Sequence, residues 1–232
     1  MQSEAAKEML AHFNDPQAVA QYTEGPVRFV PGYAELHRMT AILLGERAGP
    51  HAKVLVLGAG GGMELKALAD AHPGWTFEGV DPAREMLKLA ERVLGEHAAR
   101  AELREGYIED ASEGPFDAAA CLLTLHFLDR GTRVRTAAEI RRRLTPGAPF
   151  VAAHSSFPQG ASVRPQWLSR YAAYAVASGA DPEMAEKARA SVAAHLDLLT
   201  PEEDEAVLRE AGFSEVTPFY AAFTWRGWVA YA

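Results

Sequence analysis

Residues 53–64 read KVLVLGAGGGME, and this stretch decides the fold of the chain. It begins with a short apolar run rich in β-formers, and its glycines follow the spacing G-x-G-x-G at Gly58, Gly60 and Gly62. Glycines let the backbone turn sharply and let a ligand approach where a Cβ would collide. A helical pattern follows, and the first turn of such a helix presents unpaired N–H groups to a ligand. The stretch therefore predicts a strand, a ligand-binding turn and a helix.

The alternation of strands and helices continues on both sides of this stretch. Further strands are predicted over 75–80, 101–105, 116–123 and 149–154, and helices over 33–44, 64–71, 81–94 and 132–144. Two β-rich runs near the end, 216–220 and 223–231, are close enough to pair as an antiparallel hairpin. This order favours an α/β fold of the doubly wound, Rossmann-like kind, with a mostly parallel sheet, a C-terminal antiparallel hairpin and helical insertions.

No internal repeat or long linker interrupts the 232 residues, so we expect one domain. Its predicted parts are an N-terminal helical cap over 1–48, a cofactor-binding core over 52–156, a helical lid insertion over 157–198, and a C-terminal helix and hairpin over 200–232.

Composition limits the partners of the chain. Lys and Arg total 23 against 31 Asp and Glu, which gives a net charge of −8 and disfavours a nucleic-acid partner. The single cysteine cannot form an internal disulfide, and no motif with metal-ligand spacing occurs. The first ten residues do not resemble a secretory signal, and no apolar run approaches the ~20 residues of a membrane span. We therefore expect a cytoplasmic protein with a small-molecule substrate, no metal and no membrane association, and we leave open whether it forms a homodimer.

Asp81 ends the second predicted strand, about twenty residues beyond the glycines. A carboxylate there can accept both hydroxyl hydrogens of a ribose, as in NAD and S-adenosylmethionine sites. It can also cap the helix that begins at Pro82, and the two roles are compatible. A dinucleotide fingerprint would need a third glycine where Met63 stands, and the Gly-Lys-Ser/Thr of a nucleoside triphosphate loop is absent.

Four segments, in order, resemble motifs of the class I S-adenosylmethionine-dependent methyltransferases. They are VLVLGAGGG (54–62), GVDP (79–82), GPFD with LLTLHFL (114–117 and 122–128), and LTPGA (144–148). The resemblance implies S-adenosylmethionine as cofactor and S-adenosylhomocysteine as product. It implies that the glycine loop holds the methionine portion, that the GVDP segment meets the ribose, and that Tyr107 and Ile108 lie near the adenine. The residues expected at the cofactor from these motifs are Gly58, Ala59, Gly60, Gly62, Asp81, Pro82, Tyr107, Ile108 and Leu122.

A narrower likeness points to carboxy-S-adenosylmethionine synthase and its relatives. Pro31-Gly32-Tyr33, Leu199-Thr200 and Ala211-Gly212-Phe213 with the aromatic ending resemble that family. The family's tyrosine after Pro-Gly contacts the cofactor, so Tyr33 becomes a candidate.

The chain departs from this narrower family at three positions. Tyr107 stands where an acidic residue would face the adenine, and Leu122 replaces an asparagine near the cofactor. Ser191 stands where an arginine would hold the additional carboxylate, and Arg189 lies two places away. These departures favour S-adenosylmethionine over its carboxylated form.

Methyl transfer needs the nucleophile and the methyl group held in line, and it needs a base only when the nucleophile carries a proton. His126 lies just past the fourth strand, at the edge where ligands bind in open α/β sheets. We interpret it as a base or substrate-orienting group, against the alternative of a half-buried histidine packed on Phe127 and Leu128.

Two further groups admit both structural and functional interpretations. The run 141–143 (RRR) could grip a phosphate, but three cations in the last turn of a helix also complement its dipole, and we favour the latter. Trp167, Tyr171 and Tyr174 share a helix face that could be a core contact or a pocket wall.

The leading hypothesis is an S-adenosylmethionine-dependent methyltransferase acting on a small molecule. The alternatives are a carboxy-S-adenosylmethionine synthase-like enzyme, a nicotinamide-dependent oxidoreductase, and a cofactor-binding module without catalysis.

Overall fold

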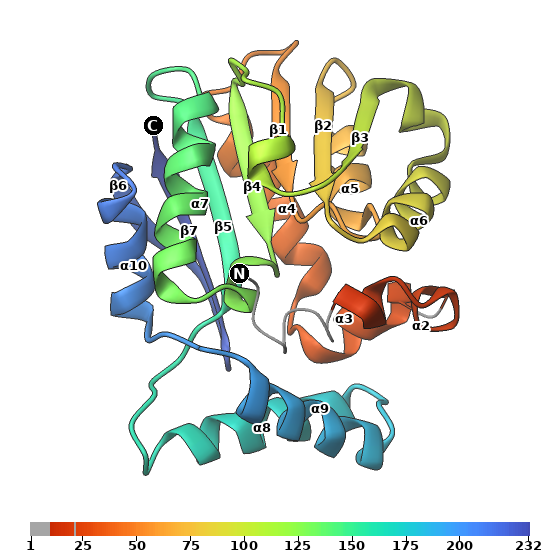
Figure 1. The fold of residues 1–232 in the computed structure, drawn as a ribbon, viewed down its shortest axis with the longest axis vertical. Helices are drawn as coiled ribbons and strands as arrows, with labels where there is room; N and C mark the ends of the chain where they lie inside the picture. The colour runs from red at the N-terminus through yellow and green to blue at the C-terminus, as the bar shows by residue number, and fades with distance from the viewer. Residues whose placement is uncertain (1–9, 21) are drawn as a thin grey trace.

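A computed structural model describes residues 10–20 and 22–232. Its strands form one seven-stranded sheet in the order β3-β2-β1-β4-β5-β7-β6 (Figure 1). The first five strands run parallel, and β7 is antiparallel to both β5 and β6. The Rossmann-like α/β fold with a C-terminal antiparallel pair is therefore confirmed. The strands are β1 Lys53–Leu57, β2 Thr76–Asp81, β3 Ala101–Glu105, β4 Ala118–Leu122, β5 Pro149–Ser155, β6 Ser214–Ala222 and β7 Trp225–Tyr231.

Helices cover both faces of this sheet. The larger ones around the sheet are α4 Tyr33–Gly45, α5 Met63–Ala71, α6 Arg84–Leu94, α7 Arg130–Arg143 and α10 Pro201–Glu210. A second group lies beyond the carboxyl ends of the parallel strands: α2 Pro16–Ala20, α3 Gly25–Phe29, α8 Arg164–Ala177 and α9 Pro182–His195 (Figure 1). Short 3₁₀ turns are η1 Tyr22–Glu24, η2 Gly95–Arg100, η3 Ile108–Asp110 and η4 Leu125–Phe127.

The alternation of side chains along β1 builds two cores. Val54 and Val56 pack with α4, α5 and α6 on one face of the sheet. Leu55 and Leu57 pack with α7 and α10 on the other. All four side chains are buried, because a strand in the middle of a parallel sheet is covered on both faces.

Some element boundaries differ from the predicted ones for local reasons. The helix predicted from residue 81 begins at Arg84, because Asp81 is still the last residue of β2. The strand predicted over 116–123 is shorter: Phe116 makes only an isolated bridge with Leu144, and Leu123 has a φ of 55°, which ends the strand. The predicted N-terminal cap includes residues 1–9 and 21, which lie outside the described residues.

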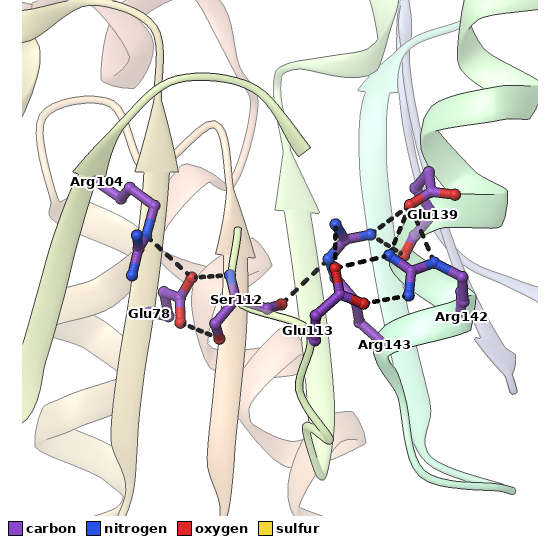
Figure 2. A network of polar contacts seen from close by, with 7 residues as sticks. All are labelled: Glu78, Arg104, Ser112, Glu113, Glu139, Arg142 and Arg143. Carbon is purple, nitrogen blue, oxygen red and sulfur yellow. Dashed lines mark hydrogen bonds and ion pairs between the residues drawn. The ribbon is translucent and has the colours of Figure 1, made fainter. Parts of the chain in front are cut away.

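Two of the three arginines at the end of α7, Arg142 and Arg143, serve the fold. The buried Arg143 donates from Nε to the Ser112 carbonyl at 3.1 Å and pairs with Glu139 at 2.5 Å. Ser112 donates from its backbone N to Glu78 at 2.7 Å and from its hydroxyl at 2.6 Å. Arg142 also pairs with Glu139 (Figure 2). The network ties α7 to β2 through the chain after η3, a structural role that the sequence interpretation, which invoked the helix dipole, did not specify.

In the part of the chain that the structure describes, no helix is long and apolar enough to cross a membrane. Nor does any group of three or more His, Cys, Asp or Glu side chains within 10–20 and 22–232 form a metal site. Cys121 is a buried thiol in β4.

Candidate functional site

The glycine loop has the tight geometry that its sequence predicts. Gly58 has a φ of +75°, and a Cβ on it would lie 1.9 Å from the Thr124 hydroxyl oxygen. Gly62 has a φ of +81°, and a Cβ there would lie 2.7 Å from the Cα of Ala90 in α6. Both positions therefore require glycine, for backbone conformation and for space. The loop leaves β1 and leads directly into α5.

Asp81 joins this loop to the end of β2. Its Oδ2 accepts a hydrogen bond from the Gly60 N–H at 2.9 Å, and its Oδ1 accepts one from the Ala83 N–H at 2.8 Å. Burial raises the pKa of this carboxyl, although both N–H groups act in the opposite direction. Each carboxylate oxygen keeps a second lone pair, so Asp81 can accept two more hydrogen bonds. That capacity suits a vicinal diol.

A cavity of about 380 Å³ lies at the carboxyl ends of the central strands, within the ~300–1,000 Å³ range of small-molecule sites. The ten cofactor-contact residues expected from the sequence all line it: Tyr33, Gly58, Ala59, Gly60, Gly62, Asp81, Pro82, Tyr107, Ile108 and Leu122.

His126, the expected base, is not brought to this cavity. It does not line the cavity, and its ring lies 4.3 Å from that of Phe127 and 5.7 Å from that of Trp225. Its Nδ1 accepts a long hydrogen bond, 3.5 Å, from the Ser155 N–H. Burial lowers the pKa of the imidazole well below its ordinary value. The short turn η4 directs Phe127 to the cavity and His126 into the interior behind it.

The aromatic stripe on α8 also packs away from the cavity. Tyr171 lies 5.2 Å from the ring of Phe29, and Trp167 lies 6.4 Å from that of Phe157. Neither these two residues nor Tyr174 lines the cavity. The stripe therefore serves as a packing contact of the insertion.

An aromatic wall was not predicted. Phe13 packs edge-on against Tyr22 and against Phe127, with ring centroids 5.9 Å apart in both pairs. All three line the cavity. They come from the N-terminal segment and from η4, and no motif marks the first two. Only the fold brings them together, so no sequence signal could have identified them.

Tyr33 and His37 form a second aromatic pair at the cavity, on the first turn and a half of α4. Their ring centroids are 4.4 Å apart. Burial lowers the pKa of His37 to about 4, so this imidazole is neutral at pH 7. Burial also raises the pKa of the Tyr33 phenol, which therefore stays protonated.

The described lining of the cavity is rich in acidic groups. Its carboxyl groups are Glu64, Asp81 and Glu109, and no lysine or arginine occurs among its described lining residues. Glu64, the second residue of α5, is buried, and its Oε1 has no hydrogen-bond partner. Burial raises the pKa of Glu64 to about 8, against a hydrogen bond from the Leu122 backbone. An acidic residue after the glycines was visible in the sequence, but its burial was not.

Known proteins are similar to this chain in sequence and in fold. A protein-family model described as a methyltransferase domain matches residues 55–150. A carboxy-S-adenosyl-L-methionine synthase of Methylococcus capsulatus is 30% identical over 217 residues, covering 88% of this chain and 86% of the relative. One of Campylobacter hominis is 27% identical over 193 residues, covering 82% and 81%.

Two solved structures share the fold at low sequence identity. An O-methyltransferase family protein of Burkholderia thailandensis superposes with a TM-score of 0.71 at 18% identity, covering 97% of this chain and 62% of that one. Human N-acetylserotonin methyltransferase in complex with S-adenosylmethionine gives a TM-score of 0.66 at 16% identity, covering 96% and 58%. The chain thus spans about three fifths of the length of these two proteins.

The chain belongs to the class I S-adenosylmethionine-dependent methyltransferase family, and S-adenosylmethionine is its cofactor. Within that family it is similar to proteins named carboxy-S-adenosyl-L-methionine synthase. This family membership excludes the alternative of a nicotinamide-dependent oxidoreductase.

Proposed function

We propose that the protein transfers a methyl group from S-adenosylmethionine to a small, largely apolar acceptor. The observation that carries this proposal is the charge of the cavity, whose described lining holds three carboxyl groups and neither lysine nor arginine. Such a cavity favours a cationic sulfonium. A carboxylated cofactor carries an additional anion, which would need a cationic partner there.

Arg189, the arginine two places before the position where a partner of the additional carboxylate was expected, is paired elsewhere. Arg189 lies on α9 and pairs with Glu186 on the same helix at 2.5 Å. It is not a lining residue of the cavity, and neither is Ser191. The departures seen in the sequence and the cavity lining therefore agree in favouring S-adenosylmethionine.

The residues present fit this cofactor. The two left-handed glycines leave room where any Cβ would collide, and Asp81 has acceptor capacity for the ribose hydroxyls. Tyr107 and Ile108 would lie near the adenine. When bound, the cofactor supplies a methyl group activated by positive sulfur, and the bonding electrons stay on sulfur as the acceptor takes the methyl.

The contribution of the chain is to position the acceptor and exclude water, which together are worth up to ~7–11 kcal/mol of the barrier in favourable cases. The aromatic wall of Phe13, Tyr22 and Phe127 provides an apolar surface for this purpose, with Leu128 and Leu196 beside it. This lining suits a neutral apolar or aromatic acceptor. His126 lies outside the cavity, and the proposal assigns it no step.

Calorimetric titration tests the cofactor site. We expect S-adenosylmethionine and S-adenosylhomocysteine to bind the unmodified protein, and Asp81→Asn to weaken both by roughly 10- to 100-fold, since hydrogen bonds to a charged group are lost. Glu46→Gln is the control, because it removes the same charge from an exposed residue directly after α4 and outside the cavity. Equal affinities for Asp81→Asn and Glu46→Gln would show that the site is misassigned.

A second function is favoured by the similarity to carboxy-S-adenosyl-L-methionine synthases, which extends over 88% of this chain in one comparison. Tyr33, from the segment that resembles that family, does line the cavity. Mass spectrometry of the ligand that co-purifies separates the two functions. A cofactor with a carboxyl group in place of one methyl hydrogen would replace our proposal with this one.

A further inference from the structure

Glu64 is a buried acid at the cavity with no function assigned so far. The residue is only 7% exposed, and its Oε1 has no hydrogen-bond partner. It is the second residue of α5, directly after the glycine loop. A buried carboxylate oxygen without a partner is costly, and the cost is avoided when the group stays protonated or meets a cation. Its exposure to the cavity points to a ligand as the source of that cation.

The sheet order places Glu64 and Asp81 on opposite sides of the loop. β1 lies between β2 and β4. Asp81 ends β2, whereas Glu64 is hydrogen-bonded to the backbone of Leu122 at the end of β4. A ligand whose ribose meets Asp81 and which crosses the glycine loop therefore has its other end at Glu64. In S-adenosylmethionine that other end is an amino acid, with an α-ammonium group.

The described cavity lining contains no lysine or arginine. Its two histidines are His37, whose pKa burial lowers to about 4, and His195, an exposed residue at the end of α9. The titratable groups facing Glu64 are Tyr33 from α4 and Cys121 from β4. Burial raises the pKa of both groups, so both are neutral at pH 7. The charge of the Glu64 carboxylate is thus left for a ligand to balance.

We propose that Glu64 is the counter-ion of the α-ammonium group of the bound cofactor. This inference rests on the cofactor site described above. It makes Glu64 a positioning residue that fixes the amino-acid end of the ligand, and through it the direction of the methyl group.

The test compares three ligands that differ in their charged groups. S-Adenosylmethionine carries two positive charges, the sulfonium and the α-ammonium, and S-adenosylhomocysteine carries only the second of them. Both also carry an α-carboxylate, whereas 5′-methylthioadenosine lacks the whole amino-acid end. For Glu64→Gln we expect S-adenosylhomocysteine and S-adenosylmethionine to bind about 10- to 100-fold more weakly, with 5′-methylthioadenosine within about twofold of the unmodified protein. Glu46→Gln should leave all three affinities unchanged.

Two outcomes would overturn the proposal. Equal weakening of S-adenosylhomocysteine and 5′-methylthioadenosine would make Glu64 a structural residue, and weakening of S-adenosylmethionine alone would assign it to the sulfonium. If the unmodified protein bound none of the three ligands, the cofactor site itself would fail, and that result is distinguishable from both.

A second measurement needs no variant and so remains available if Glu64→Gln does not fold. Calorimetry near pH 7 in buffers of different ionisation enthalpy counts the protons released on binding. Because burial holds the pKa of Glu64 near 8, pairing with an ammonium should release close to one proton per S-adenosylhomocysteine bound. 5′-Methylthioadenosine should release none, and equal release by the two ligands would contradict the proposal.

Discussion

Asparagine in place of Asp204 should lower the free energy of unfolding by about 3–5 kcal/mol, because it leaves a buried guanidinium without its counter-charge. The side chains of Arg133 in α7 and Asp204 in α10 are 0% and 1% exposed, and Nη1 lies 2.8 Å from Oδ1. Arg133 also donates to the Leu128 carbonyl at 2.9 Å and to the Asp197 carbonyl at 2.6 Å. Burial by itself would raise the pKa of Asp204, but His154 and Arg133 lower it overall.

The loss is measurable by urea denaturation followed by circular dichroism. At this chain length, 3–5 kcal/mol corresponds to a fall in Tm of roughly 6–20 °C. The urea midpoint should fall with little change in the m-value. The double variant Arg133→Met/Asp204→Leu should recover much of the loss, because replacing both partners of a buried pair by apolar residues removes the uncompensated charge.

A matched control lies on the same two helices. Arg130 and Glu210 form an exposed pair at 2.8 Å, so Glu210→Gln should cost less than about 1 kcal/mol. If Asp204→Asn destabilised the protein no more than Glu210→Gln, the argument from the buried charge would be refuted.

Two further predictions concern the glycine loop and the first turn of α5. Gly62→Ala should lower the free energy of unfolding by about 2–5 kcal/mol, from the left-handed backbone and the 2.7 Å approach to Ala90; Gly147→Ala, with φ +77° and open space, should cost only about 1–2 kcal/mol by the same denaturation. If Gly62→Ala and Gly147→Ala lowered the free energy of unfolding equally, the contribution of the close approach to Ala90 would be excluded. The pKa of Glu64, raised from 4.5 to about 8, means that the folded state keeps a proton that the unfolded state releases. The free energy of unfolding should therefore fall as the pH rises from about 5 to about 8, by at most about 1.4 kcal/mol per pH unit, relative to Glu64→Gln. Parallel pH profiles for the two proteins would contradict this.

Much of the cofactor site could be predicted because its signals are local. A glycine is needed wherever φ is positive and no Cβ fits, so Gly58 and Gly62 mark the loop from sequence alone. The start of α10 is local in the same way, since Thr200 and Glu203 form a capping box there. Asp81 was found for the same reason, since a parallel strand brings its last residue to the ligand edge.

The remaining residues could not be predicted, because side-chain direction and burial depend on distant segments. His126 and Phe127 are neighbours in sequence, yet only Phe127 faces the cavity. The direction was decided by the turn η4 and by the packing of His126 near His154 and Trp225, from β5 and β7. Phe13 reaches the cavity only because the N-terminal segment folds across the strand ends.

The sequence by itself determined the sheet, the loop and the ribose acceptor, because apolar runs, glycine conformations and strand ends are set by residues close in the chain. Only the tertiary structure decided the charge of the cavity. Glu64 is a solvated acid or a buried one according to what packs over the first turn of α5, and α4 and β4 bury it. Desolvation by segments far apart in the sequence thus converts an ordinary glutamate into a group poised for a cation.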